Sequence, residues 1–206
     1  MSSKLQTDRI LILFAHPALQ KSRVNRVLIG AVQGIQGVTI HDLYQIYPDF
    51  HVDPKQEQNL LGVHDILVIQ YPFLWYSVPA LVREWQDLVL ENGWAYGRRG
   101  TALHGKKLMC AVSTGAGEEA YRGSHPNRFS MRDLLAPMEQ MARLCGMEYL
   151  PPFLVHGTFQ MPEPEIHRHA LDYRRTLEAL RDGRVDLVAA AKLPRINLPL
   201  AAVIRD

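Results

Sequence analysis

Three segments of the sequence carry residue types that could bind a ligand, and each follows an apolar run. The first segment, residues 16–25, opens a helical pattern and includes His16, Ser22, Arg23, Val24 and Asn25. Free backbone N–H groups and the positive end of a helix dipole favour an anion at such a place. The Ser22 hydroxyl and the His16 and Arg23 side chains would add hydrogen bonds to a phosphate. The alternative is an ordinary capped loop in which His16 is a hydrogen-bonded turn residue.

The second segment, residues 71–79, gathers aromatic side chains between an apolar run and a helical pattern. It contains Pro72, Phe73, Leu74, Trp75 and Tyr76. An exposed aromatic cluster invites aggregation unless something covers it, and a flat ring system would cover this one. The alternatives are an aromatic plug at the edge of the fold and a dimer surface.

The third segment consists of small residues, Ser113, Thr114, Gly115 and Ala116. Small side chains let a backbone approach a ligand closely, and the backbone N–H groups can then donate to a ring carbonyl. A plain glycine-rich turn would explain this segment if it stood alone. Its expected position beside the other two segments favours a binding role.

The elements that must position these segments alternate in type along the chain. Short apolar runs typical of buried strands lie at residues 10–15, 38–43, 66–70, 108–112 and 149–155, with helical patterns between them. This alternation predicts an α/β fold with a doubly wound, five-stranded parallel sheet. Pro151 and Pro152 are expected to place the start of the fifth strand at an edge or a bulge. Ligands of such sheets bind outside the carboxyl ends of the strands, where the three segments would meet.

Length, charge and cysteine content limit the class of protein. The 206 residues suit one domain at 1–184, followed by an irregular tail at 185–206 that we expect to pack on the domain or on a dimer mate, or else to dock on another protein. A net charge of only +2 argues against nucleic acid as a partner. Cys110 and Cys145 are expected to be buried thiols, and the sequence predicts no metal site. No apolar run approaches the roughly 20 residues of a membrane span, so we expect a cytoplasmic protein.

Several short segments, in one order along the chain, resemble a known family. The segments are Ala15–Pro17, Ser22–Asn25, Asp42–Tyr44, Tyr47–Phe50, Pro72–Pro79, Gly93–Gly97, Leu103–Lys106 and Thr114–Gly115. They are similar to the NAD(P)H quinone oxidoreductase branch of the flavodoxin-like superfamily. Within that branch, the chain resembles the ancillary flavoproteins of bacterial glutathione-gated potassium-efflux systems.

The resemblance implies a flavin site, with FMN or FAD as the cofactor and NADPH or NADH as the electron donor. It places His16 and residues 22–25 at the flavin phosphate, Pro72 to Tyr76 along the ring system, and Ser113 to Ala116 at its pyrimidine side. It also implies that Tyr121 and His125 are hydrogen-bond donors near the oxygens of a quinone substrate. Two departures stand out: Ala116 replaces a glycine of many relatives, and the spacing before His125 is shorter.

The resemblance leaves competing functions open. The protein would be a two-electron quinone reductase with ping-pong kinetics, or a regulatory subunit that binds a membrane potassium-efflux protein and so lies at the inner face of the membrane. A one-electron carrier ranks last, because such carriers usually are acidic and this chain is not. A homodimer is implied by the family alone.

Overall fold

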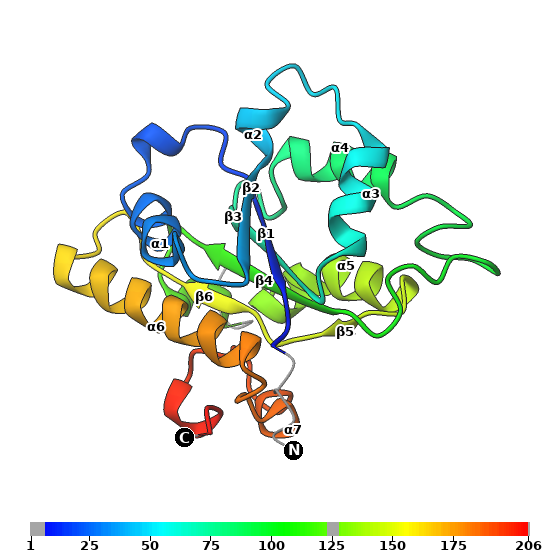
Figure 1. Ribbon diagram of the computed structural model, residues 1–206. Coiled ribbons are helices and arrows are strands. Elements are labelled where there is room, and N and C mark those ends of the chain that lie inside the picture. Colours follow the sequence, from blue (N-terminus) through cyan, green and yellow to red (C-terminus); the bar gives the residue numbers. More distant parts are fainter. Residues whose placement is uncertain (1–6, 123–127, 206) are drawn as a thin grey trace.

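The predicted doubly wound sheet of parallel strands is confirmed (Figure 1). The computed structural model describes residues 7–122 and 128–205, so the predicted site residue His125 lies outside the described residues. The strands are β1 (Ile10–Phe14), β2 (Val38–Asp42), β3 (Ile66–Pro72), β4 (Lys107–Ser113), β5 (Glu148–Tyr149) and β6 (Phe153–Val155). The order across the sheet is β2-β1-β3-β4, and both β5 and β6 pair with β4. Every pairing is parallel.

The fifth predicted strand is split in two, and the prolines lie in its middle rather than at its start. Leu150 still donates its backbone N–H to Leu108 O at 2.8 Å, but the next two residues are Pro151 and Pro152, which have no N–H to donate. Pairing resumes at Phe153, which lies opposite Ala111 of β4. The interruption therefore follows from the missing donors, and β6 resumes pairing with β4 one residue out of the register of β5.

Helices cover both faces of the sheet, as the alternating pattern predicted (Figure 1). One face is covered by α1 (Val24–Val32) and α6 (Glu163–Arg181), and the other by α3 (Pro54–Gly62), α4 (Ala80–Val89) and α5 (Met131–Leu144). The short elements are η1 (Leu19–Lys21), α2 (Leu43–Ile46), η2 (Glu118–Tyr121), α7 (Leu187–Ala190) and η3 (Leu200–Ala202). No helix in the described part of the chain is long and apolar enough to cross a membrane.

Successive side chains of a strand point to opposite faces of the sheet, and this alternation divides the hydrophobic core into two layers. In β1, Leu11 and Leu13 face the layer with α4 and α5, while Ile10, Ile12 and Phe14 face the layer with α1 and α6. All five side chains are at most 1% exposed. Because both faces of β1, β3 and β4 are buried, the only parts of these strands that a ligand can reach are their ends.

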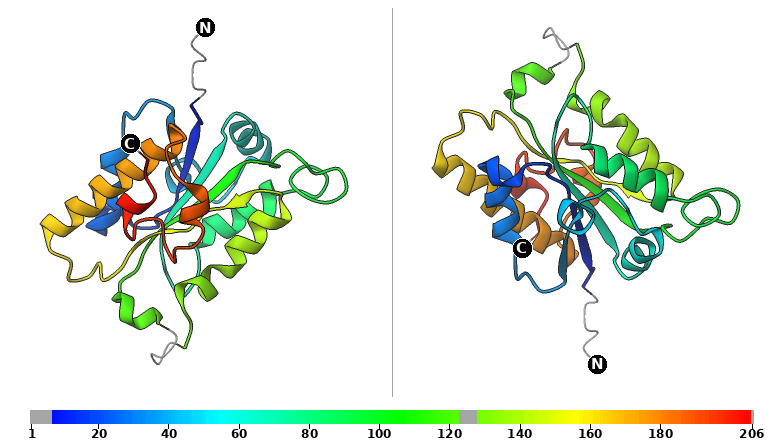
Figure 2. Two further views of the ribbon diagram at one scale, coloured as in Figure 1. Left: turned by 90° about the horizontal axis from the view of Figure 1, so that it is seen from below. Right: turned by 90° about the horizontal axis from the view of Figure 1, so that it is seen from above.

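The C-terminal segment packs against the layer that contains α6. Val185, Ala190, Ile196 and Val203 are buried in the same cluster as α1 and α6. The side chain of Asn197 brackets the backbone of Leu154 in β6, accepting its N–H at 3.2 Å and donating to its carbonyl at 2.9 Å. Figure 2 shows this segment, orange to red, running beside α6. Of the two alternatives for the tail, this burial favours packing on the domain.

Candidate functional site

A pocket of about 310 Å³ opens at the carboxyl ends of β1, β3 and β4. All three segments singled out in the sequence contribute to it, because parallel strands end at the same edge of the sheet. The predicted residues that line it are His16, Ser22, Arg23, Val24, Asn25, Pro72, Phe73, Leu74, Ser113 and Gly115. Trp75, Tyr76, Thr114 and Ala116 were also predicted here, but they lie beside the pocket rather than on its wall.

The amino end of α1 forms the polar part of the pocket. Ser22 Oγ accepts the backbone N–H of Asn25 at 3.1 Å, so this hydroxyl caps the first turn of the helix as predicted. Lys21 lies on the same wall. The Arg23 guanidinium instead pairs with Glu163 of α6 at 2.9 Å, with both side chains about half exposed. The pocket thus combines a helix amino terminus with a lysine, which suits an anion.

His16 stands at the end of β1 as a neutral hydrogen-bond donor. Its Nδ1 accepts the backbone N–H of Ala18 at 3.1 Å. Burial lowers the pKa of His16, and this keeps the imidazole uncharged near neutral pH. When Nδ1 is the acceptor of a neutral imidazole, the proton resides on Nε2. The Nε2–H group is then left to donate to a ligand.

Asn25 ties the start of α1 to the end of β4. Its Nδ2 donates to Ser113 Oγ at 2.7 Å, and the two residues are 2% and 5% exposed. The Asn25 Oδ1 atom is buried, and no other described residue donates to it. A buried acceptor without a partner costs about 1–3 kcal/mol. Since Asn25 lines the pocket, a donor group on a ligand is the natural partner for this oxygen.

The aromatic segment forms a tight turn with an unusual backbone. Ser77 donates its N–H to Leu74 O at 3.0 Å, and the two central residues, Trp75 and Tyr76, have φ angles of 50° and 61°. Positive φ at both central positions defines a type I′ turn, which normally uses glycine or asparagine. Such strain is concentrated at functional sites in proteins. The Trp75 side chain is 94% exposed, so its indole does not line the pocket wall.

Tyr121 lies next to the pocket and packs against a histidine that the sequence argument missed. The rings of Tyr121 and His156 have centroids 5.4 Å apart, and Phe73 approaches Tyr121 with a centroid separation of 6.3 Å. Thr114 Oγ1 donates to Ala116 O at 2.8 Å and lies 2.9 Å from His156 Nδ1. Because the single hydroxyl proton of Thr114 is engaged, His156 Nδ1–H is the donor in that pair.

Burial sets the charge state of both rings. Burial, aided by the nearby positive charge of Arg195, lowers the pKa of His156 to about 4, so this imidazole is neutral at physiological pH. Burial also raises the pKa of Tyr121, and the phenol therefore keeps its proton and remains a hydrogen-bond donor. His125, which was predicted together with Tyr121 as a donor to the substrate, lies outside the described residues; the histidine found beside Tyr121 among the described residues is His156.

A fourth loop, which follows β6, completes the pocket with Thr158 and Phe159. Phe159 lies so close to Gly115 that a Cβ there would come within 2.3 Å of its ring. Gly157 donates its N–H to Ala116 O at 2.9 Å, which joins this loop to the third segment. The sequence argument placed the strand before this loop but considered only three loops. The signal that could have found this loop is the fifth predicted strand at 149–155, because its carboxyl end lies at the same edge of the sheet as those of the other strands.

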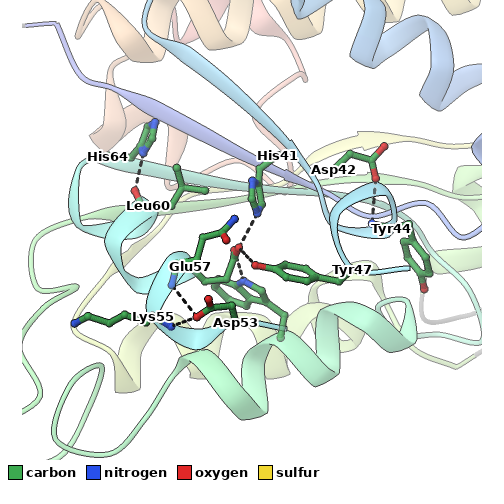
Figure 3. A network of polar contacts seen from close by, with 11 residues as sticks. His41, Asp42, Tyr44, Tyr47, Asp53, Lys55, Glu57, Leu60 and His64 are labelled. Carbon is green, nitrogen blue, oxygen red and sulfur yellow. Dashed lines mark hydrogen bonds and ion pairs between the residues drawn. The ribbon is translucent and has the colours of Figure 1, made fainter. Parts of the chain in front are cut away.

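A second polar cluster lies outside the pocket and was not predicted (Figure 3). The Glu57 carboxylate of α3 is fully buried and accepts from His41 Nε2 at 2.7 Å, Tyr47 OH at 2.7 Å and Trp85 Nε1 at 2.8 Å. Burial alone would raise the pKa of Glu57, but the hydrogen bonds from these three donors outweigh it and hold the pKa below its usual value. The cluster ties α3 to β2, to α4 and to the segment after α2.

Comparisons with known proteins show which family the chain is similar to. The flavodoxin-like fold family matches residues 8–177. The chain is 42% identical over 172 residues to the glutathione-regulated potassium-efflux system ancillary protein KefG of Cronobacter sakazakii, covering 84% of this chain and 94% of that protein. It is 40% identical to the structure of general stress protein 14 from Treponema denticola in complex with FMN, with a TM-score of 0.80 and coverage of 84% and 99%.

A second solved structure, an NADPH-quinone reductase from P. pentosaceus, is 32% identical with a TM-score of 0.75 and coverage of 82% and 96%. The family match at residues 8–177 spans all the residues that line the pocket. The chain therefore belongs to the flavodoxin-like NAD(P)H quinone reductase family.

Proposed function

We propose that this protein is an FMN-dependent NAD(P)H:quinone oxidoreductase that moves two electrons by ping-pong kinetics. The observation that carries the proposal is the pocket itself, which joins a helix amino terminus, an apolar wall and a small-residue loop in one cavity. Support also comes from the related general stress protein 14 of Treponema denticola, whose structure contains FMN.

The residues of the pocket fit FMN. The start of α1, Lys21 and the His16 Nε2–H would hold the phosphate. Pro72, Phe73 and Leu74 would line one side of the ring system, and the backbone at Ser113 and Gly115 would donate to its pyrimidine edge. The unpartnered Asn25 Oδ1 would accept from a hydroxyl or N–H group of the cofactor. When bound, FMN supplies the hydride-accepting and electron-donating chemistry, and the protein supplies position and electrostatics.

Tyr121 is the proposed donor to the oxygens of the quinone. Its phenol keeps its proton because burial raises the pKa, and the contacts with Phe73 and His156 fix the ring at the rim of the pocket. A phenol held there would stabilise negative charge on a substrate oxygen as reduction proceeds. His125, the second proposed donor, remains a proposal from the resemblance.

The test is an absorption spectrum of the purified protein after loading with FMN and desalting. Bands that persist, bleach anaerobically with NADPH and return when a quinone is added are the expected result. A protein that retains no flavin would refute the cofactor site. Retained flavin that NADPH does not bleach would refute the reductase while leaving a flavin-binding protein. Replacing FMN with FAD, and NADPH with NADH, in the same assay determines the preference for each.

A second candidate function is that of an ancillary subunit for a membrane potassium-efflux protein. It is favoured by the 42% identity to the KefG protein of Cronobacter sakazakii, which extends over nearly all of that relative. The measurement is co-purification of the full chain with such an efflux protein from membranes. Association without any quinone reduction would favour this function over the first, and reduction without association would favour the reverse.

We also propose a homodimer, by resemblance to the family. Trp75 beside the pocket and Phe159 on its wall are 94% and 84% exposed, and both would be covered in such an assembly. Light scattering from the purified protein at micromolar concentration tests this. A monomer with intact quinone reduction would overturn it.

A further inference from the structure

The C-terminal segment reaches the candidate site through a single arginine. Arg195 donates from Nη2 to Glu118 Oε2 at 3.0 Å, although the two residues are 77 positions apart in the sequence. The side chain of Arg195 is only 15% exposed, whereas that of Glu118 is 46% exposed. Arg195 is therefore the more firmly held partner of the ion pair, and Glu118 belongs to the element that Arg195 holds in place.

The segment that carries Arg195 is held in place by hydrogen bonds and burial. The residue after Arg195, Ile196, is fully buried and donates its backbone N–H to Pro152 O at 3.0 Å. The next residue, Asn197, makes the two hydrogen bonds to the backbone of Leu154. Together these bonds fasten residues 196–197 along β6, the strand that ends one residue before His156. Arg195 thus projects from a segment whose position is set by the sheet.

The other end of the contact is the short helical turn η2, which begins at Glu118 and ends at Tyr121. No side chain caps the amino end of this turn. Contacts with other parts of the chain therefore help to hold the turn, and they include the Arg195–Glu118 pair and the packing of Tyr121 on His156 and Phe73. Within the loop, Ala120 is buried and donates its N–H to Gly117 O at 3.2 Å. The pair acts at one end of the turn, and the phenol lies at the other.

We propose that Arg195 is a positioning residue of the reductase site, which holds the Glu118–Tyr121 turn in place and thereby sets the position of the Tyr121 phenol at the pocket. This inference rests on the proposed function for the role of Tyr121. Arg195 lies beyond residues 8–177, the part of the chain that the flavodoxin-like fold family matches. The contact is thus made by a segment that lies outside the matched core of the family.

The same arginine acts on the electrostatics around His156. The charged and titratable groups that face this imidazole are Arg195 of the C-terminal segment, Glu118 and Glu119 of η2, and His169 of α6, with the Thr114 hydroxyl and the Tyr121 ring in contact. Arg195 and His169 lower the pKa of His156, while the two glutamates raise it. Removing Arg195 and removing Glu118 therefore shift the titration of His156 in opposite directions, yet both break the same ion pair.

The test compares Arg195→Gln with Glu118→Gln, and uses Arg205→Gln as the matched control. Arg205 also lies in the C-terminal segment and pairs with a carboxylate, Asp186, at 2.8 Å, but it makes no contact with η2 in the described residues. With FMN-loaded protein, both Arg195→Gln and Glu118→Gln are expected to raise the KM for quinone by about two- to fivefold, the range for losing one partly exposed ion pair. The FMN dissociation constant is expected to stay the same, and Arg205→Gln to leave both quantities unchanged.

The second measurement needs no flavin. Proton NMR of the flavin-free protein follows the His156 imidazole as pH is varied. Arg195→Gln is expected to raise its pKa and Glu118→Gln to lower it, relative to Arg205→Gln. The charge reversal Arg195→Glu with Glu118→Arg is expected to restore the KM of the natural chain. If Arg195→Gln does not fold, the exposed Glu118→Gln variant and the charge reversal still carry the test.

The two hypotheses fail in different ways. A natural chain that reduces no quinone overturns the proposed function and with it the role of Arg195 in the reaction, whereas the opposite titration shifts would still show that Arg195 and Glu118 both lie near His156. Equal KM values for Arg195→Gln and Arg205→Gln in an active enzyme overturn the positioning role. Titration shifts without any change in KM overturn it as well, because they would show an electrostatic effect on His156 that does not reach Tyr121.

Discussion

Replacing Ser113 with alanine tests the connection between α1 and β4 across the pocket. The change removes one oxygen atom, Ser113 Oγ, which accepts from Asn25 Nδ2 at 2.7 Å. The neighbouring Asn25 Oδ1 is already without a partner among the described residues. The variant therefore leaves the whole amide of Asn25 without a hydrogen bond inside the protein, at a position that is 2% exposed.

The size of the effect follows from that burial. An unsatisfied buried donor costs about 1–3 kcal/mol, so Ser113→Ala is expected to lower the free energy of unfolding of the flavin-free protein by that amount. The amide also loses the bond that orients Oδ1 toward the ligand. We expect the FMN dissociation constant to rise by about five- to tenfold, which corresponds to roughly 1–1.4 kcal/mol.

The assays are urea unfolding of the flavin-free protein and quenching of FMN fluorescence. Thr176→Val is the matched control, because the Thr176 hydroxyl is equally buried but donates to Asp172 O within α6, far from the pocket in sequence and on another element. This control is expected to leave the FMN affinity unchanged. The reasoning is refuted if Ser113→Ala binds FMN as tightly as Thr176→Val, or if it loses no more stability than that control.

Other perturbations have equally definite expected outcomes. Glu57→Leu is expected to lower the free energy of unfolding by about 3–5 kcal/mol in urea, because three buried donors lose their acceptor; a loss below about 1 kcal/mol would contradict this. The His156 pKa lies near 4 in the folded chain, against 6.5 as the ordinary value, so the unfolded chain takes up the proton first as pH falls. Stability should then decrease by up to about 3 kcal/mol between pH 7 and pH 4, and His156→Asn should flatten that part of the pH profile. Trp75→Gly is expected to raise the free energy of unfolding by up to about 1 kcal/mol, because glycine adopts positive φ without strain, and a loss of stability would count against a strained turn.

Hydrophobic periodicity was sufficient to predict the layers of the fold. The apolar runs at 10–15, 66–70 and 108–112 indicated strands buried on both faces, and each is a central strand of the sheet. Asp53 and Pro54 set the start of α3, because the Asp53 carboxylate accepts the N–H groups of Lys55 and Gln56 and Pro54 takes the first helical position. The expectation that Pro151 and Pro152 mark an edge or a bulge is confirmed, because β5 and β6 lie at the edge of the sheet and residues 150–152 lie opposite only two residues of β4.

The candidate site shows what the sequence alone determined and what required the tertiary structure. The parallel direction of the strands follows from the alternation of strand and helix patterns, and this was enough to bring residues 16–25, 71–76 and 113–116 to one edge of the sheet. The order of the strands across the sheet came from the structure. The contacts of Asn25 with Ser113, of Tyr121 with His156 and of Arg195 with Glu118 join residues that are 88, 35 and 77 positions apart in the chain. No periodicity or spacing encodes such pairs, because they depend on how far each loop extends beyond its strand and on which side chains then share a buried space. Tertiary packing determined these three contacts. It also placed Arg195 of the C-terminal segment, which lies beyond the matched residues 8–177, next to the candidate site.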